Sequence, residues 1–440
     1  MNNICINPTL NTEKTIGIKT DWSKEMSSDF SINNDNNNDI KQQNLQNKKP
    51  DIFINPPTTC TQEAVDGIKY DFNDGLRILF PQNGKKYRCL FADNDTDIVL
   101  YCNDTIPGCL ITSTKKFYIN FKLEIYEQEK YDKPIFTHEF NCKDKDVLIQ
   151  IPDGAIGDAI AWFSYVEPFY KKTQCKCHVM MPKRFIELYS KQYPDLHFVT
   201  REEAEKLTPY ATYRLGLYFK GDVDHQPWDF RLIGLHTQAG YLLGLRDKEL
   251  LESAPRFDLS AKRQIKEKYV VIATHSSSHC KMWNNPAGWR EVIKYLKEQG
   301  YRVLCIDKLN EYGENQVWHH TPNGCEDFTG DLPLQERINL IKDADMFIGV
   351  SSGLSWIAWC CKVPVIMISG FTAPWNEFYT PYRVINEQVC HGCWNDTRCE
   401  FVHEDFLWCP RKTKPEEKFE CTKMISSKMV INQINKIIKK

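Results

Sequence analysis

From about residue 147 onward the chain alternates between short apolar runs and longer amphipathic stretches. The runs VLIQIP (Val147 to Pro152), CKCHVMM and HFVT are typical of strands, and the stretches AIAWFSYVEPFY and KRFIELYSKQ between them are typical of helices. Strands that alternate with helices in this way form parallel sheets covered by helices. The pattern therefore predicts a first α/β lobe, which we place at residues 147–265.

A second alternation begins at KYVVIAT (Lys268 to Thr274) and predicts a second lobe at residues 266–389. Its further strands are YRVLCID, MFIGV and VPVIMIS, and its helices are LQERINLIKDA, GLSWIAWCC and WREVIKYLKEQG, which Gly300 closes. Two such units predict two Rossmann-like lobes with a cleft between them. Because ligands of open α/β sheets bind beyond the carboxyl ends of the strands, we expect the functional residues directly after these strands.

The segment before the first lobe has two different patterns. Residues 1–50 are polar and rich in Asn, which predicts a flexible tail. Residues 51–146 contain short runs such as LRILF and FYINFKLEIYE, separated by DG, NG and PG turns. This pattern predicts a small, mostly β domain, and since it has no catalytic motif, we expect it to contact an acceptor or another subunit.

Charge and hydropathy exclude two classes of partner. The 440 residues include 56 basic and 58 acidic side chains, so the net charge of -2 does not indicate a nucleic-acid partner. No run approaches the roughly 18 apolar residues of a membrane-spanning helix, and the N-terminus has no apolar segment of a secretory signal. We therefore expect a cytoplasmic protein without a membrane span.

The loop after VLIQIP carries the first candidate for catalysis. Its sequence is DGAIGD, in which two glycines allow a ligand to approach the backbone and Asp158 stands at the start of a helix. A carboxylate there could act as the general base on an acceptor hydroxyl. The alternative is that Asp158 only caps the helix, because Asp is a favoured N-cap residue.

The loop after VVIAT is rich in hydroxyl groups and contains one cation. Ser276 and its neighbours can donate hydrogen bonds to a pyrophosphate, and Lys281 can supply positive charge. The alternative for a single lysine is a solvated surface position, but the spacing of Lys281, Trp283 and Trp289 makes this loop more specific. Asp307 follows the next strand, where an acidic residue commonly accepts hydrogen bonds from ribose hydroxyls.

The segment from Gly349 to Ser355 joins a strand to a helix through small residues. Free N–H groups at the start of that helix, together with the helix dipole, can hold a diphosphate near Ser352, Gly353 and Leu354. An ordinary turn with serine caps is the alternative interpretation.

Taken together, these loops resemble a known family. Gly157 with Asp158, Lys281 with Trp283, and the GVxxGLS segment from Gly349 occur in the same order in the lipopolysaccharide-type heptosyltransferases, which have a glycosyltransferase B-type fold. The chain more closely resembles the bacterial autotransporter heptosyltransferases. That resemblance is carried by IPDGAIGDAIAWFSYVEPF, DHQPWDFRLIGLHTQAGYLLGL, SSGLSWIAW, GFTAPWNEFYTPYRVIN and a terminal CHGC, and covers almost everything beyond the tail.

The resemblance implies an inverting protein O-glycosyltransferase that moves heptose from ADP-heptose onto serine hydroxyls of an autotransporter adhesin passenger. It implies that Asp158 is the base and that Lys281 contacts the donor diphosphate. It also implies a donor site of Ser276, Asp307, Ser352, Gly353 and Leu354, and a ring-like homododecamer.

The chain departs from the lipopolysaccharide enzymes at two positions of the donor region. Ser351 stands where those enzymes carry an acidic residue, and Trp356 replaces their histidine. These two differences concern the recognition of the sugar and of the acceptor.

Five of the 18 cysteines lie between Cys390 and Cys421. Such a cluster in a reducing compartment indicates a metal site, and four thiolates suit zinc or a single iron ion. We expect Cys399, six residues after Cys393, to be the surplus cysteine. The family resemblance implies one structural iron ion, with zinc as the alternative, on Cys390, Cys393, Cys409 and Cys421, within a metal clamp and C-terminal helix at residues 390–440.

Two competing functions remain open from the sequence. One is a lipopolysaccharide-core glycosyltransferase of the same fold, against which the β domain and the cysteines argue. The other is a non-catalytic scaffold that binds an adhesin, in which Asp158 would be dispensable. Trp375 and Phe378 could line a sugar pocket or belong to the core.

Overall fold

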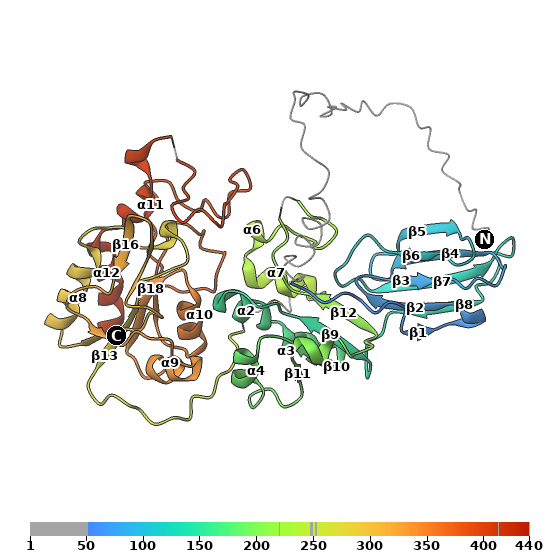
Figure 1. Ribbon diagram of the computed structural model, residues 1–440, viewed down its shortest axis with the longest axis horizontal. Coiled ribbons are helices and arrows are strands. Elements are labelled where there is room, and N and C mark those ends of the chain that lie inside the picture. Colours follow the sequence, from blue (N-terminus) through green and yellow to red (C-terminus); the bar gives the residue numbers. More distant parts are fainter. Residues whose placement is uncertain (1–51, 220, 247–249, 251–252, 412, 440) are drawn as a thin grey trace, which may run out of the picture. The chain divides into compact units, whose positions relative to one another are not determined.

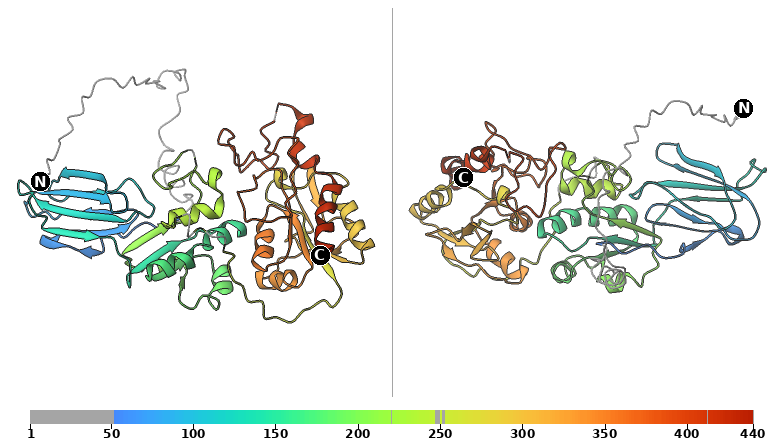
Figure 2. Two further views of the ribbon diagram at one scale, coloured as in Figure 1. Left: turned by 180° about the vertical axis from the view of Figure 1, so that it is seen from behind. Right: turned by 45° about the horizontal axis from the view of Figure 1, so that its top comes forward.

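The computed structural model of the protein describes residues 52–219, 221–246, 250, 253–411 and 413–439, and the tail predicted at residues 1–50 lies outside them. Residues 52–440 form one compact unit. Figures 1 and 2 show its helices and strands coloured along the chain.

Short strands dominate the N-terminal part of the described chain, as predicted. They are β1 (Gln62–Glu63), β2 (Lys69–Asn73), β3 (Arg77–Leu79), β4 (Tyr87–Asp93), β5 (Ile98–Asp104), β6 (Leu110–Thr112), β7 (Phe121–Glu127) and β8 (Phe136–Glu139), with a short 3-10 helix η1 (Val65–Gly67). Four of them form an antiparallel sheet in the order β5-β4-β7-β8. Along most of β7 every second side chain is buried, because successive side chains of a strand point to opposite faces of the sheet.

The first lobe alternates strands and helices. Its elements are β9 (Asp146–Gln150), α2 (Ile156–Phe163), α3 (Val166–Thr173), β10 (Lys176–Met180), α4 (Lys183–Tyr189), β11 (His197–Val199), α5 (Arg201–Ala204), β12 (Ala211–Arg214), α6 (Phe230–Ile233) and α7 (Leu235–Leu242). The strands β11-β10-β9-β12 are parallel, and β12 pairs in turn with β2, which continues the sheet to β3 and β6. Strands on both sides of residue 146 thus share one sheet, so the domain boundary there stays a prediction.

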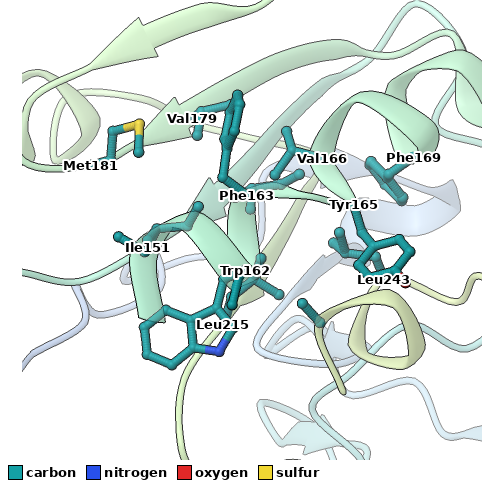
Figure 3. Packing of buried hydrophobic residues seen from close by; sticks show 14 of the residues in the cluster. Ile151, Trp162, Phe163, Tyr165, Val166, Phe169, Val179, Met181, Leu215 and Leu243 are labelled. Atoms are coloured by element: carbon teal, nitrogen blue, oxygen red, sulfur yellow. The ribbon is translucent and has the colours of Figure 1, made fainter. Parts of the chain in front are cut away.

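The predicted helix AIAWFSYVEPFY is divided into α2 and α3 at Ser164 and Tyr165. Pro168 explains the division, because proline has no N–H to donate to the carbonyl of Ser164 and its ring collides with that carbonyl. Both helices bury apolar side chains against the sheet. Figure 3 shows Phe163 of α2 packed near Val179 of β10, whereas Trp162 points away from that strand residue.

The second lobe has a purely parallel sheet with a separate hairpin. Its elements are β13 (Tyr269–Ala273), α8 (Gly288–Glu298), β14 (Arg302–Cys305), β15 (Glu311–Glu314), β16 (Val317–His320), β17 (Glu326–Asp327), α9 (Leu334–Ile341), β18 (Met346–Val350), α10 (Gly353–Cys360) and β19 (Val365–Ile368). The sheet has the order β17-β14-β13-β18-β19, and the antiparallel hairpin is β15-β16. The two-lobed α/β fold with a β-rich N-terminal part is the fold class that the sequence predicts.

Helices cover both faces of the second sheet. Val270 and Ile272 of β13 pack with residues of α8 and of the C-terminal helix α12 (Ser427–Ile438), whereas Val271 and Ala273 pack with residues of α9 and α10. Gly300 ends α8 with a φ of 79°, as predicted. In the described residues we find no helix with the length and apolarity needed to cross a membrane.

Candidate active site

The topology brings the predicted loops to one place. In the second sheet, β13 lies between β14 and β18, so the loops after these three strands meet at the point where the strand order reverses. In the first sheet the same point lies at β9, which is followed by the loop that leads to Asp158. The first turns of α2 and α10 touch, since a Cβ on Gly157 would lie 2.8 Å from the Trp356 side chain.

Two adjoining pockets lie at this meeting point. The larger has a volume of about 760 Å³ and is lined by the predicted residues Ser276, Asp307, Ser352, Gly353 and Leu354. A nucleotide fits a pocket of this size.

The smaller pocket has a volume of about 270 Å³ and contains Asp158 and Lys281. It shares Ser276, Ser352 and Gly353 with the larger one, so a single ligand can extend from one pocket into the other.

Asp158 lies in the first turn of α2 rather than at its N-cap, which is Ala155. The interpretation of Asp158 as a helix cap is therefore wrong. Burial raises the pKa of Asp158 above its ordinary value, and the nearby charges of Lys281 and His403 lower it in part. Among the described residues we find no hydrogen-bond or ion-pair partner of this carboxylate, so it is available to a ligand.

Lys281 ends a short 3-10 helix η3 (His279–Lys281) in the loop after β13, and its ammonium lies 5.5 Å from the centre of the Phe371 ring. The two tryptophans that made this loop distinctive have a structural role. Trp283 is buried, donates a hydrogen bond to the carbonyl of Ile425 at 2.9 Å and packs against Trp289 with ring centres 5.1 Å apart. They fix the loop that carries the lysine.

Ser352 is the N-cap of α10, and its buried hydroxyl has no hydrogen-bond partner in the part of the chain that the structure describes. An orphaned buried hydroxyl is costly, since its hydrogen bonds to water are lost without replacement. The N–H groups of Gly353 and Leu354 in the first turn of α10 also have no hydrogen-bond partner among the described residues and can bind an anion, whereas the Ser355 N–H donates to the Ser352 carbonyl at 3.1 Å. Both features suit a diphosphate at the border of the two pockets.

Asp307 is buried at the wall of the larger pocket and already holds the loop after β13. It accepts hydrogen bonds from the Thr274 N–H at 2.8 Å, the Thr274 hydroxyl at 2.9 Å and the His275 N–H at 3.2 Å. Arg337 supports Asp307 by donating to its backbone carbonyl at 3.2 Å. Asp307 thus fixes the loop after β13 that forms one wall of the pocket, and it also lines the pocket itself.

Several residues of the smaller pocket are not among those predicted from the sequence. Glu377 lines it, as do the aromatic residues Trp394 and Phe401 and the neighbouring His403 from the cysteine-rich segment. The segment GFTAPWNEF does contribute to the pocket, through Phe371, Thr372, Asn376 and Glu377 rather than through Trp375 and Phe378. Phe378 is fully buried against Trp356 and Trp359, and Trp375 is 53% exposed.

The predicted metal ligands come close together without forming a metal-binding group. In the described ranges no three or more His, Cys, Asp or Glu side chains are arranged to hold a metal ion. A hydrogen bond with Cys421 lowers the pKa of Cys390 to about 6, and the charges of Cys393 and Cys409 also act on Cys421. Four neighbouring thiols are the donor set of a tetrahedral zinc or iron site, so the residues present fit such an ion.

Two Rossmann-like lobes, with a carboxylate, a lysine and a helix N-terminus around adjoining pockets, define a glycosyltransferase that uses a nucleotide-sugar. Residues 65–129 match the family "Glycosyltransferase TibC, N-terminal domain", and residues 232–403 match "Glycosyltransferase family 9 (heptosyltransferase)". The chain belongs to the autotransporter heptosyltransferases of this family.

The relatives match the chain along most of its length. The autotransporter heptosyltransferase TibC of Escherichia coli O78:H11 is 47% identical over 88% of this chain and 94% of its own. The autotransporter heptosyltransferase Aah of Escherichia coli is 48% identical over 87% of this chain and 96% of its own. A protein of Burkholderia thailandensis, BimC, described as an inactive autotransporter heptosyltransferase, is 36% identical over 88% of this chain and 89% of its own.

Two solved structures have the same fold. Both are crystal structures of TibC, the first of them from enterotoxigenic Escherichia coli, and each has a TM-score of 0.83, 46% identity and coverage of 88% of this chain and 99% of that chain. One is described as an iron-containing dodecameric glycosyltransferase, and the other as its complex with ADP-D-beta-D-heptose.

Proposed function

We propose that this glycosyltransferase moves heptose from ADP-heptose onto serine hydroxyl groups of an autotransporter adhesin passenger in the cytoplasm. The unpartnered carboxylate of Asp158, beside Lys281 in the smaller pocket, is the observation that carries the proposal. The size of the larger pocket and the complex of the related TibC with ADP-heptose support the choice of donor.

The reaction follows from the groups around the pockets. Asp158 takes the proton from the serine hydroxyl while the serine oxygen forms a bond to the anomeric carbon of the heptose. The bond from that carbon to the β-phosphate oxygen of ADP breaks, and its electron pair leaves with ADP. Because the oxygen attacks opposite the leaving group, the anomeric configuration is inverted.

The leaving diphosphate gains negative charge as this bond breaks. Lys281, the hydroxyl of Ser352 and the N–H groups at the start of α10 provide positive charge and hydrogen bonds near that position. Ser276, Asp307, Gly353 and Leu354 complete the donor site of this proposal.

A structural metal ion is the second part of the proposal. Cys390, Cys393, Cys409 and Cys421 would hold one iron ion, as supported by the proximity of the four thiols and by the iron in the related TibC. Such an ion, with zinc as the alternative, would cross-link the irregular segment that carries Trp394 and His403.

We also propose that the chain forms a homo-oligomer, with the dodecamer of the related TibC as the expected form. The edge strand β5 supports association, because Ile98 and Val99 are 58% and 56% exposed. An exposed apolar edge strand favours contact with another chain. Light scattering coupled to size-exclusion chromatography measures the number of subunits.

The test uses purified protein, ADP-heptose and a passenger fragment, whose mass is followed with time. We expect heptose-sized mass increases with the wild type, and a rate about 10²- to 10⁴-fold lower with Asp158→Asn. Lys281→Ala tests the donor contact. The control is Asp146→Asn, since this exposed carboxylate at the start of β9 pairs with His178 and lines neither pocket.

Three results would contradict the proposal. A wild-type rate of transfer by Asp158→Asn would show that Asp158 is not the catalytic base. Transfer to lipopolysaccharide core but not to the passenger would show that the protein is a lipopolysaccharide-core glycosyltransferase. Passenger binding without transfer from any sugar nucleotide would favour a scaffold.

A further inference from the structure

The smaller pocket contains a second carboxylate, whose surroundings differ from those of Asp158. Glu377 follows β19 in the segment GFTAPWNEF, and its side chain is only 2% exposed. It lines the same pocket as Asp158 and Lys281. A carboxylate is rarely buried without compensation, so its contacts indicate its use.

Both oxygens of Glu377 are held by the protein. The guanidinium of Arg383 donates to Oε2 at 2.9 Å, and the hydroxyl of Ser351 donates to Oε1. The Arg383 side chain is itself buried, so the pair is shielded from water. The carboxylate is therefore fixed in position, and each of its oxygens retains capacity to accept one more hydrogen bond.

These contacts separate the roles of the two carboxylates. Glu377 is held by a buried guanidinium and a hydroxyl group, whereas the carboxylate of Asp158 has no hydrogen-bond or ion-pair partner among the described residues. Glu377 suits the binding of groups that donate hydrogen bonds. Hydroxyl groups of a sugar are such donors, and the aromatic residues Trp356 and Phe371 in the same pocket can pack against the C–H faces of a sugar ring.

We propose that Glu377, positioned by Ser351 and Arg383, recognises the sugar of the nucleotide-sugar donor by accepting hydrogen bonds from its hydroxyl groups. This inference rests on the proposed function, because it requires the nucleotide to occupy the larger pocket and the sugar to occupy the smaller one. Glu377 is then a specificity-determining residue for the sugar and has no part in binding ADP itself.

The experiment compares the Kd of ADP with the Kd of ADP-heptose by calorimetry on the full-length protein. In the wild type we expect ADP-heptose to bind more tightly than ADP. In Glu377→Gln we expect this preference to fall about 10- to 100-fold, the usual effect of losing hydrogen bonds to a charged group. The Kd of ADP should not change.

A rescue variant distinguishes recognition from a structural ion pair. In Ser351→Asp/Glu377→Gln a carboxylate returns to the same hydrogen-bonded pair, now from position 351. We expect this double variant to regain part of the preference for ADP-heptose. If Glu377→Gln does not fold, Ser351→Ala replaces it, since loss of the positioning hydroxyl should lower the same preference to a smaller extent.

The matched control is Asp71→Asn, which breaks a buried ion pair far from the pocket residues. Asp71 of β2 receives two hydrogen bonds from Arg77 at 2.6 Å and 2.8 Å and does not line either pocket. We expect Asp71→Asn to lower the melting temperature and leave the preference for ADP-heptose unchanged.

Two results would overturn the inference in distinguishable ways. If the wild type prefers ADP-heptose and Glu377→Gln keeps that preference, the assignment of Glu377 is wrong while the proposed function stands. If the wild type binds ADP and ADP-heptose equally and transfers no sugar, the proposed function fails, and the role of Glu377 fails with it.

Discussion

A Cβ atom on Gly353 would lie 3.2 Å from the backbone nitrogen of Gly157 and 2.6 Å from Cβ of Ile156. The first turn of α10, which faces the donor pocket, therefore touches the first turn of α2, which carries Asp158. No larger residue fits at position 353 without a shift of one helix.

Gly353→Ala should separate these helices and weaken both stability and donor binding. Overpacking of this kind costs about 1 to 3 kcal/mol of folding free energy. We expect a lower melting temperature and a higher Kd for ADP, measured by calorimetry. Gly154→Ala is the control for the melting temperature only, because a Cβ there meets no atom within 4 Å while Gly154 itself lines the larger pocket. An unchanged melting temperature and an unchanged Kd for ADP in Gly353→Ala would show that the close contact has no role in the donor site.

The rate of transfer should depend on pH through Asp158. The base must be ionised, and burial raises its pKa, so kcat/KM should fall on acidification at a pH above the ordinary aspartate value of about 3.9. Lys281→Ala removes a charge that lowers this pKa, so the fall should begin at higher pH. His403→Ala should shift the profile in the same direction but less, because His403 is exposed.

The control for this profile is Lys294→Ala, which removes an exposed charge on α8 and should leave the acidic limb in place. The position of the limb is independent of the absolute rate, so it can be read even if Lys281→Ala binds the donor poorly. An acidic limb that is the same in the wild type and in Lys281→Ala would argue against Asp158 as the titrating base.

The sequence predicts the two lobes well because buried parallel strands are continuous apolar runs. VVIA of β13 and MFIGV of β18 are buried at every position, which makes them distinct from the amphipathic helix α8. The pairing of β12 with β2 was not predictable, because Ala211 and Phe72 are far apart in sequence and neither strand indicates its partner.

The candidate site was predicted where a residue follows a strand. Asp158, Lys281, Asp307 and Ser352 all occupy such positions, and all line one of the two pockets. Glu377 was missed because its place depends on a hydrogen bond from Ser351, 26 residues earlier. Residues from the irregular cysteine-rich segment, such as His403, have no periodic pattern that would place them.

The four proposed metal ligands should differ from the surplus cysteine. Serine at Cys409 or Cys421 removes a thiolate, so we expect bound iron to fall from about one ion per subunit toward zero, measured by mass spectrometry of the metal. The segment after Cys390 should then be cleaved faster in limited proteolysis. Cys399→Ser is the control and should retain the ion. If only Cys399→Ser loses iron, Cys399 is a metal ligand and one of the four cysteines proposed as ligands is the surplus one.

The hairpin β15-β16 is joined to the loop of Lys281 by a pair of histidines. Nδ1 of His279 lies 2.8 Å from Nε2 of His319, so one ring must donate and the other accept, which two protonated rings cannot do. Burial, with the charges of His319, Lys423 and Lys418, lowers the pKa of His279 to about 4. Burial also lowers the pKa of His319.

Stability should therefore fall as the pH decreases from about 6.5, the ordinary histidine pKa, to about 4. In this window the unfolded chain binds more protons than the folded one, so acidification favours unfolding. Denaturant unfolding at about pH 7.5 and about pH 5 measures how much the free energy of unfolding falls between these two pH values. We expect this fall to be ~1 kcal/mol smaller in His279→Gln than in the wild type, after allowance for solvent screening. Trp318→Phe, at an exposed position of the same strand and without a titratable group, should keep the wild-type dependence. An unchanged pH dependence in His279→Gln would mean that the pair does not couple the hairpin to protonation.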